Sequence, residues 1–344
     1  MYDLPAPMLA KAVREIPDAG TYAFEPKWDG FRVLAAWDGT RVELGSRGAK
    51  PLTRYFPEIV AALAEVLPGP CLLDGELVVA AGTPGHARLD WEALSARIHP
   101  AASRVAALAV ETPAMLIAFD LLAIGDELMQ DLPFASRRER LEQWLGDVPH
   151  PVHLTRTTAD PGLAGRWLSA FEGAGLDGVM AKPLDQPYTP GKRTMLKIKH
   201  ARTADVVALG YRMHRSGVGV GSLLVGLFDA EGGLHNVGGV SAFTDARRRE
   251  LIDELAPWVE RDADGSALIA QTERSRFSGA KDLSFVRLRP ERVLEVRYDQ
   301  LEGARFRHTV QFERWRPDRD AASCTYDQLE VVAAYDLADV LEGA

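Results

Sequence analysis

Hydrophobic and polar positions divide the chain into two regions with different patterns. Residues 1–202 mix short apolar runs, typical of strands, with stretches of helical periodicity. Asp38-Gly39 predicts a hairpin turn, and Ser136 with Glu139 has capping-box spacing at a helix start. This region is predicted to be an α+β domain of mainly antiparallel sheets with helices. Strands are predicted at 22–24, 31–37, 41–44, 71–80, 115–122, 178–181 and 195–200, and helices at 54–66, 91–98 and 137–145.

The second region, residues 203–320, is rich in strands. A helix at 245–255, N-capped by Thr244, interrupts them. Short strands with one intervening helix are typical of a small β-barrel such as an OB-fold, which is predicted here. The acidic segment 321–344 is predicted either to dock as a helix or to stay loose. The strands are predicted at 206–211, 222–228, 234–240, 293–301 and 307–312.

Composition and charge limit the class of protein. The chain has 344 residues, of which 47% are apolar and 26% charged, as in an ordinary globular protein with room for two domains. Cys71 and Cys324 leave no disulfide framework and no zinc-ligand cluster. No signal peptide and no apolar run of membrane-spanning length is recognisable, so a cytoplasmic protein without a membrane partner is expected. The net charge of −9 argues against a nucleic-acid binder, but bases outnumber acids between residues 266 and 319.

Charged residues interrupt several of the predicted strands. Asp74 and Glu76 lie inside an apolar run, Asp120 follows another, and Lys197 and Lys199 share one face because strand side chains alternate. Buried charges have to be paired, hydrogen-bonded or metal-bound. Taken singly, each segment fits an edge strand that faces water. Taken together, they predict one cleft lined for a polyphosphate and its divalent cation.

The sharpest motif is Lys27-Trp28-Asp29-Gly30-Phe31-Arg32. Only 8 of the 40 Lys and Arg residues are lysine, and lysine, unlike arginine, can lose its proton and act as a nucleophile. By itself the motif is also compatible with a turn between solvated charges. Five of the eight lysines nevertheless lie in the segments that carry motifs: Lys27, Lys182, Lys192, Lys197 and Lys199.

Further motifs follow in order, and over residues 5–320 the chain resembles the DNA ligases of the covalent nucleotidyltransferase superfamily. In length and layout it is most similar to the minimal two-domain bacterial ligases of type C. The matching segments are Lys27–Gly30 (motif I), Ser46–Gly48 (Ia), Asp74–Glu76 (III), Phe119–Asp120, Asp177–Lys182 (IV), Lys197–Lys199 (V) and Arg314–Arg319 (VI).

The resemblance implies an ATP-dependent DNA ligase. Such an enzyme carries AMP on its lysine, here Lys27, transfers it to the 5′-phosphate of a nick and releases it when the 3′-OH attacks. The implied fold is an ATP-grasp-like nucleotidyltransferase domain followed by an OB-fold. The implied cofactors are ATP and Mg²⁺, with Mn²⁺ as a substitute. Nicked double-stranded DNA is the implied partner of a monomeric enzyme in DNA repair and recombination.

The resemblance also implies roles for individual residues. Lys27 has to be uncharged when it attacks, and Glu76 and Asp177 are the expected metal ligands because hard oxygen donors suit Mg²⁺. Glu25 is expected to read the base, and Phe119 either stacks on adenine or belongs to the core. Besides Glu25, Glu76 and Phe119, the expected nucleotide-binding residues are Arg32, Arg47, Arg193, Lys197 and Lys199, and the remaining motif residues are Asp29, Arg314, Arg316, Asp318 and Arg319.

Three positions depart from the usual family pattern, and two alternatives stay open. Asp177 stands where the family usually has Glu, Met195 where it usually has Trp, and Arg319 where it often has Lys. An RNA ligase or capping guanylyltransferase shares motif I, and an inactive OB-fold DNA-binding module would need no nucleophile. Residues 214–221 and 274–281 are candidate DNA contacts.

Overall fold

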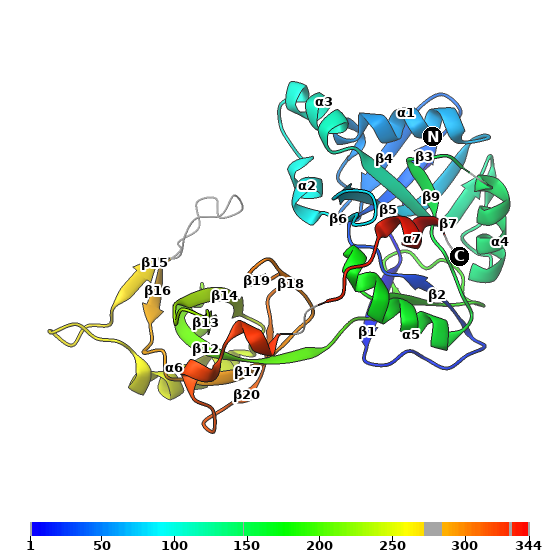
Figure 1. Ribbon diagram of the computed structural model, residues 1–344. Coiled ribbons are helices and arrows are strands. Elements are labelled where there is room, and N and C mark those ends of the chain that lie inside the picture. Colours follow the sequence, from blue (N-terminus) through cyan, green and yellow to red (C-terminus); the bar gives the residue numbers. More distant parts are fainter. Residues whose placement is uncertain (1, 147, 272–283, 330–331, 343–344) are drawn as a thin grey trace. The chain divides into compact units, whose positions relative to one another are not determined.

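The computed structural model describes residues 2–146, 148–271, 284–329 and 332–342 (Figure 1). It contains two compact units, Met1–Lys199 with Val332–Ala344, and His200–Val331. From the sequence, the domain boundary was predicted between residues 202 and 203, and residues 321–344 were predicted to form a separate tail. In the structure, residues from Val332 onward belong with the first unit. No helix in the described ranges is long and apolar enough to cross a membrane.

Two sheets form the first unit. The larger has the order β4-β3-β5-β7-β8, with β6 on β5 and β9 on β7, and the smaller has the order β1-β11-β10-β2. All pairings are antiparallel except β7–β9 and β1–β11. The strands are β1 (Leu9–Val13), β2 (Tyr22–Pro26), β3 (Phe31–Trp37), β4 (Val42–Ser46), β5 (Cys71–Ala81), β6 (Arg88–Leu89), β7 (Ala114–Ile124), β8 (Glu127–Leu128), β9 (Val152–Leu154), β10 (Val179–Pro183) and β11 (Arg193–Ile198).

Helices cover the outer faces of both sheets (Figure 1). Helices α1, α2 and α4 share an apolar core with the larger sheet, while α5, η2 and α7 share one with the smaller sheet. The inner faces of the two sheets are left to meet each other. The helices are η1 (Thr53–Tyr55), α1 (Pro57–Val66), α2 (Trp91–Ala96), α3 (Ala102–Glu111), α4 (Phe134–Leu145), α5 (Pro161–Ala170), η2 (Phe171–Ala174) and α7 (Leu337–Glu342).

Strand β5 shows why charged residues occur inside buried strands. Leu73 and Leu77 point into the core beneath the helices. Because side chains alternate, Asp74 and Glu76 point to the opposite face, toward the smaller sheet. The predicted interruptions of the apolar runs therefore mark the inner face of a sheet that is covered on both sides, not an edge facing water.

The second unit is a curled β-sheet with an OB-fold architecture. Strand β12 pairs with β13, β16 and β17, and β17 pairs with β20. A bridge between Val240 and Val310 joins the end of β14 to the segment before β20, and one apolar core fills the interior. The elements are β12 (Arg202–Met213), β13 (Val220–Phe228), β14 (Leu234–Val240), α6 (Asp245–Leu255), η3 (Ala256–Trp258), β15 (Ile269–Gln271), β16 (Ser284–Arg287), β17 (Val293–Tyr298), β18 (Leu301–Glu302), β19 (Arg305–Phe306), β20 (Gln311–Trp315), η4 (Ala321–Ser323) and η5 (Tyr326–Gln328).

Three local predictions were wrong. The helix predicted from residue 54 breaks at Phe56, and α1 begins at Pro57, because proline is accepted in the first turn but not inside a helix. Helix α4 begins at Phe134, so Ser136 lies within it and caps nothing. The strand predicted at 307–312 is replaced by β19 and β20, which begins at Gln311. The basic stretch 274–281 lies outside the described residues.

Candidate active site

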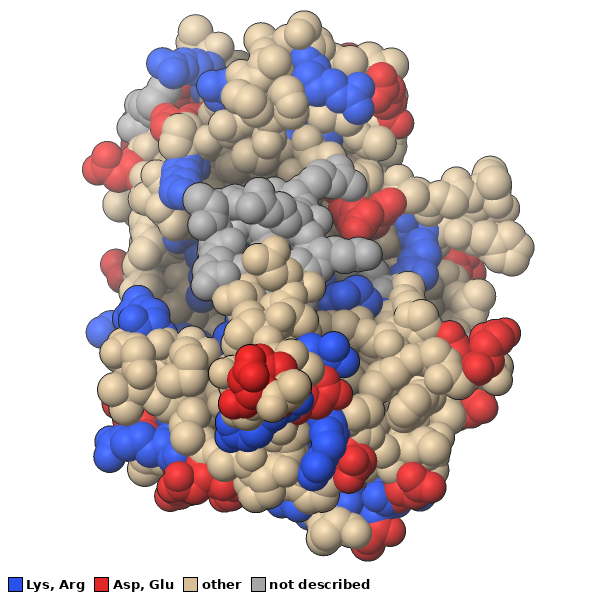
Figure 2. Space-filling model, turned by 90° about the vertical axis from the view of Figure 1, so that its left-hand side faces the viewer, with Lys and Arg blue, Asp and Glu red and all other residues tan. Residues whose placement is uncertain are grey.

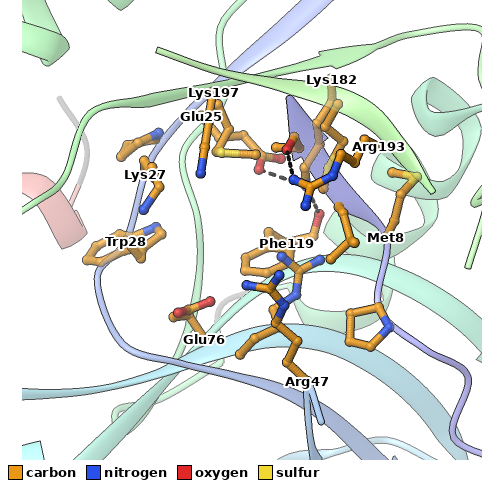
Figure 3. Close-up of a pocket in the computed structure, with 17 residues that line it drawn as sticks. Met8, Glu25, Lys27, Trp28, Arg47, Glu76, Phe119, Lys182, Arg193 and Lys197 are labelled. Atoms are coloured by element: carbon orange, nitrogen blue, oxygen red, sulfur yellow. Dashed lines mark hydrogen bonds and ion pairs between the residues drawn. The ribbon is translucent and has the colours of Figure 1, made fainter. Parts of the chain in front are cut away.

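A pocket lies between the two sheets of the first unit (Figure 3). The larger sheet contributes one lining residue from each of β3, β5 and β7, and Arg47 comes from the turn after β4. The other lining residues come from the smaller sheet, from the residues before β1 and from the segment after β2. The side chains of Lys27, Lys197 and Glu76 point into the same space (Figure 3). The lining residues are Pro7, Met8, Leu9, Ala10, Glu25, Pro26, Lys27, Trp28, Arg32, Arg47, Glu76, Phe119, Met180, Lys182, Arg193, Met195 and Lys197.

Lys27 is fixed by the segment that carries Asp177. The amide of Lys27 donates to the carbonyl oxygen of Gly178, and the amide of Asp177 donates to that of Lys27, each at 2.9 Å. The Lys27 ammonium then lies 2.5 Å from a carboxylate oxygen of Asp177. Gly178 has a φ of +135°, and a Cβ there would lie 2.1 Å from the carbonyl oxygen of Ile198. Only glycine permits this approach.

Asp177 is shared between two cations. The Lys199 ammonium lies 2.8 Å from the same carboxylate oxygen that Lys27 contacts. Burial on its own would raise the pKa of Asp177, but Lys27 and Lys199 outweigh it and hold the pKa below its ordinary value. Asp177 is therefore a carboxylate under all ordinary conditions. The structure brings together these three residues, which the sequence placed in motifs I, IV and V.

Glu76 provides the second acid of the site. It lies on β5, lines the pocket, and has a pKa raised to about 7 by burial, with Arg32 and Lys27 opposing the rise. Asp29 does not line the pocket; its negative charge also raises the pKa of Glu76. Glu76 therefore changes its charge near neutral pH, unlike Asp177.

Arg32 is held in a buried ion pair that the sequence did not predict. Its guanidinium donates to both carboxylate oxygens of Asp74, at 2.5 and 2.6 Å. The hydroxyl of Tyr188 donates to Asp74 at 2.6 Å and accepts from the amide of Met8 at 3.0 Å. The Arg32 guanidinium also lies 4.4 Å from the centre of the Phe119 ring. Tyr188 thus connects the segment before β1 to the arginine of motif I.

Glu25 and Lys182 form a second buried pair beside the same aromatic ring. The Lys182 ammonium lies 2.8 Å from Glu25 Oε2, and it donates to the carbonyl oxygen of Phe119 at 3.0 Å. It also lies 4.5 Å from the centre of the Phe119 ring, which is buried yet lines the pocket. Burial raises the pKa of Glu25, while Lys182 and Arg138 oppose the rise. Phe119 is therefore both a core and a pocket residue.

Three further cations complete the lining. Lys197 is half-buried, and burial together with the charges of Lys27 and Lys199 lowers its pKa. Arg193 is exposed and donates to the carbonyl oxygen of Ala10 at 3.1 Å. Arg47 is exposed in the turn after β4. The pocket therefore has a positive rim suited to a polyphosphate.

The motif VI residues lie in the second unit and form a separate cluster there. Arg316 contacts both Asp205 and Asp318, at 3.0 and 2.8 Å, and Arg319 contacts Asp205 at 3.2 Å. Arg314 lies 2.6 Å from Glu295. In this structure each of the three arginines thus has an acidic partner from the second unit.

Sequence reasoning left out Lys182 and Tyr188. Lys182 stood at the end of motif IV and belonged to the small set of lysines, so a signal for it existed. Tyr188 had no such signal, because it acts through contacts with residues more than a hundred positions away in sequence.

A lysine paired with an acid in a pocket between two sheets, followed by a β-barrel unit, is the arrangement of a covalent nucleotidyltransferase with an OB-fold. The chain belongs to the ATP-dependent DNA ligase family: the family model "ATP dependent DNA ligase domain" matches residues 7–199, and "ATP dependent DNA ligase C terminal region" matches residues 216–319. It is thus an enzyme that uses ATP to seal nicks in DNA.

Characterised relatives cover nearly the whole chain. It is 53% identical to DNA ligase C1 of Mycolicibacterium smegmatis, over 98% of this chain and 97% of that protein. It is 52% identical to DNA ligase C of Mycobacterium tuberculosis, with the same coverage of 98% and 97%. A solved Lig E DNA ligase has the same fold, with a TM-score of 0.57 and 18% identity over 91% of this chain and 100% of that one.

Proposed function

We propose that this ligase carries AMP on Nζ of Lys27 and that the pocket between the two sheets binds ATP. The observation that carries the proposal is the position of the Lys27 ammonium, in a pocket with a positive rim and 2.5 Å from Asp177. In the first step Nζ attacks the α-phosphorus. A P–N bond forms, the bond to the bridging oxygen of pyrophosphate breaks, and the amine proton leaves to water.

The protein's own groups prepare this step. Asp177 orients the lysine before it attacks, and Lys199 shares the same carboxylate oxygen, so the two ammonium groups stay close together. Lys197 and Arg193 line the pocket, where they offer positive charge to the phosphates. Phe119 and Glu25 also line the pocket and are assigned to the base.

The two carboxylates fit Mg²⁺. No group of three or more His, Cys, Asp or Glu side chains among the described residues could hold a metal by itself. Mg²⁺ is commonly bound by one or two carboxylates together with substrate phosphates and water. Glu76 and Asp177 would supply the two carboxylates. When bound, the ion would stabilise the charge that develops on pyrophosphate. Mn²⁺ would accept the same oxygen ligands.

The substrate that follows ATP is nicked double-stranded DNA, on which we expect the protein to act as a monomer. Contacts to phosphates dominate the affinity of such a protein, so binding should fall steeply as salt rises. Comparing nicks with DNA and RNA strands separates a DNA ligase from an RNA ligase. Flat binding between low and moderate salt would contradict this part of the proposal.

The decisive experiment is the mass of the intact protein after incubation with ATP and Mg²⁺. The unaltered protein should gain one AMP, and Lys27→Ala should gain none. Lys11→Ala is the control, because Lys11 is an exposed lysine on β1. Labelling with GTP instead of ATP would indicate a capping enzyme, and retention of AMP by Lys27→Ala would show that another residue is the nucleophile.

A further inference from the structure

We infer that Lys182 is a positioning residue that makes the pocket selective for a purine base with an amino group at position 6, because it holds Glu25 with one carboxylate oxygen left open for that group. The inference rests on the proposed binding of ATP in this pocket and deepens it. Lys182 itself acts through Glu25 and Phe119, both of which it contacts.

The pair is buried and tightly placed. The side chains of Lys182 and Glu25 are each only 3% exposed, although both line the pocket. One ammonium contacts Oε2 of Glu25 at 2.8 Å, the carbonyl oxygen of Phe119 at 3.0 Å, and the rings of Phe119 and Phe134 at 4.5 and 4.7 Å. These contacts fix the carboxylate of Glu25 relative to the aromatic ring.

The second carboxylate oxygen, Oε1, has a different environment. It is buried and has no hydrogen-bond partner among the described residues. The ion-pair contact it does make is with Arg138 Nη1 at 3.9 Å, too long for a hydrogen bond. A buried acceptor without a donor is costly. Because Glu25 lines the pocket, a bound ligand can supply the missing donor.

The chemistry of the purine bases identifies the donor. Adenine carries an amino group at position 6, which donates, whereas guanine and hypoxanthine carry a carbonyl oxygen there, which only accepts. A carboxylate oxygen can only accept a hydrogen bond, so it attracts the 6-amino group of adenine and repels the 6-carbonyl oxygen of guanine and hypoxanthine. Burial raises the pKa of Glu25, and the adjacent charge of Lys182 opposes this and favours the ionised acceptor. Without Lys182, Glu25 could take up a proton or rotate away.

The test measures adenylation of the full protein with two nucleotides, ATP and purine riboside 5′-triphosphate, which lacks the amino group. For the unaltered protein we expect a KM for ATP that is lower than that for the analogue by roughly 10- to 100-fold. Lys182→Met should raise the KM for ATP by about the same factor, change the KM for the analogue by less than about twofold, and leave kcat nearly unchanged. Lys11→Met, on an exposed lysine, is the matched control.

Two results would overturn the inference. A loss of equal size with both nucleotides would show that Lys182 merely maintains the pocket, and an unchanged preference for ATP would show that it has no part in selectivity. If Lys182→Met does not fold, the double variant Glu25→Met/Lys182→Met removes both charges and the acceptor oxygen and should show the same loss of preference. A double variant that keeps the preference also overturns the inference. If the unaltered protein gains no nucleotide at all, the proposed function itself has failed.

Discussion

Charged residues near the pocket of the first unit and Arg314 in the second unit of this ligase have opposite environments. In the first unit, Asp74, Asp120, Arg137 and Lys182 are at most 2% exposed and are paired beneath or beside the pocket. In the second unit, the side chain of Arg314 is 62% exposed. On the face shown in Figure 2, Lys and Arg side chains are interspersed with Asp and Glu.

This difference in exposure determines how firmly each charged residue is held before a ligand binds. A buried ion pair is hard to break, because removing either partner leaves an uncompensated charge in the protein interior. An exposed pair contributes little and can exchange one anion for another. The first unit is therefore fixed in advance around its pocket. Arg314 of the second unit can give up its acidic partner for a phosphate at small cost.

Among the substitutions that test this comparison, Asp120→Asn is expected to have the largest effect on stability. Arg137 donates to both carboxylate oxygens of Asp120, at 2.8 and 2.9 Å, and Arg137 itself is completely buried. Removing the negative charge leaves a buried guanidinium without its counter-ion. We expect the free energy of unfolding to fall by about 3–5 kcal/mol, measured by urea denaturation.

The matched control for Asp120→Asn is Glu111→Gln in the same unit. Glu111 pairs with Arg104 at 2.9 Å, but both side chains are about half exposed. Its substitution should change the free energy of unfolding by less than about 1 kcal/mol. Equal effects of the two substitutions would break the comparison, because burial would then not decide the strength of the pairs.

The second prediction concerns the pH dependence of adenylation. The pKa of Glu76 is raised to about 7, so the carboxylate that would bind the metal forms only as pH rises through that value. Adenylation at limiting Mg²⁺ should increase by about tenfold between pH 6 and pH 8. Glu76→Gln should be slow and lack this rise.

The same pKa predicts the opposite trend for stability. Because the folded pKa of Glu76 lies above the ordinary value of 4.5 for the free group, the folded state holds this proton more tightly than the unfolded state. The resulting stability is fully present below pH 4.5 and is lost as pH rises through about 7. A pH profile of unfolding that does not differ between the unaltered protein and Glu76→Gln would contradict the assignment.

Much of the fold was accessible from sequence because local patterns and burial agreed. Strand β3 and helix α6 were predicted at their observed bounds, and Thr244 caps α6 as expected. The gathering of Lys27, Asp177 and Lys199 was also predictable, since their motifs carry the resemblance. Each of these signals is contained in a short stretch of chain.

The remainder depended on contacts between distant segments. The partner of Arg32 is Asp74, and the partners of Glu25 are Lys182 and Arg138, none of which spacing could assign. The C-terminal segment was predicted either to dock as a helix or to stay loose, and Leu337 and Val340 of α7 are buried in a core of the first unit. The pairing partners and the surface that receives α7 follow from the tertiary fold and could not be assigned from a local pattern.

The third prediction tests the connection made by Tyr188. Tyr188→Phe removes a hydroxyl that donates to Asp74 and accepts from the amide of Met8, so two buried polar groups each lose a partner. The free energy of unfolding should fall by about 1–3 kcal/mol. Adenylation should slow less than it does in Lys27→Ala, because the Arg32–Asp74 pair remains. An unchanged unfolding midpoint would show that the hydroxyl is not needed to hold this side of the pocket.

The smallest effect is expected from Glu295→Gln in the second unit. Its pKa is lowered by the hydrogen bond from Arg314, so whatever stability the pair provides is present above pH 4.5, the ordinary value for Glu, and is lost as pH falls through the folded pKa. Because Arg314 is largely exposed, solvent screens the pair, and the free energy of unfolding should change by less than about 1 kcal/mol.

The substitution Glu295→Gln also removes an acid that competes with phosphate for Arg314. Binding of Glu295→Gln to a nicked duplex at fixed salt should therefore be unchanged or slightly tighter, whereas Arg314→Ala should weaken binding. If Glu295→Gln weakened binding as much as Arg314→Ala, Arg314 would depend on its acidic partner, and the contrast with the buried pairs of the first unit would fail.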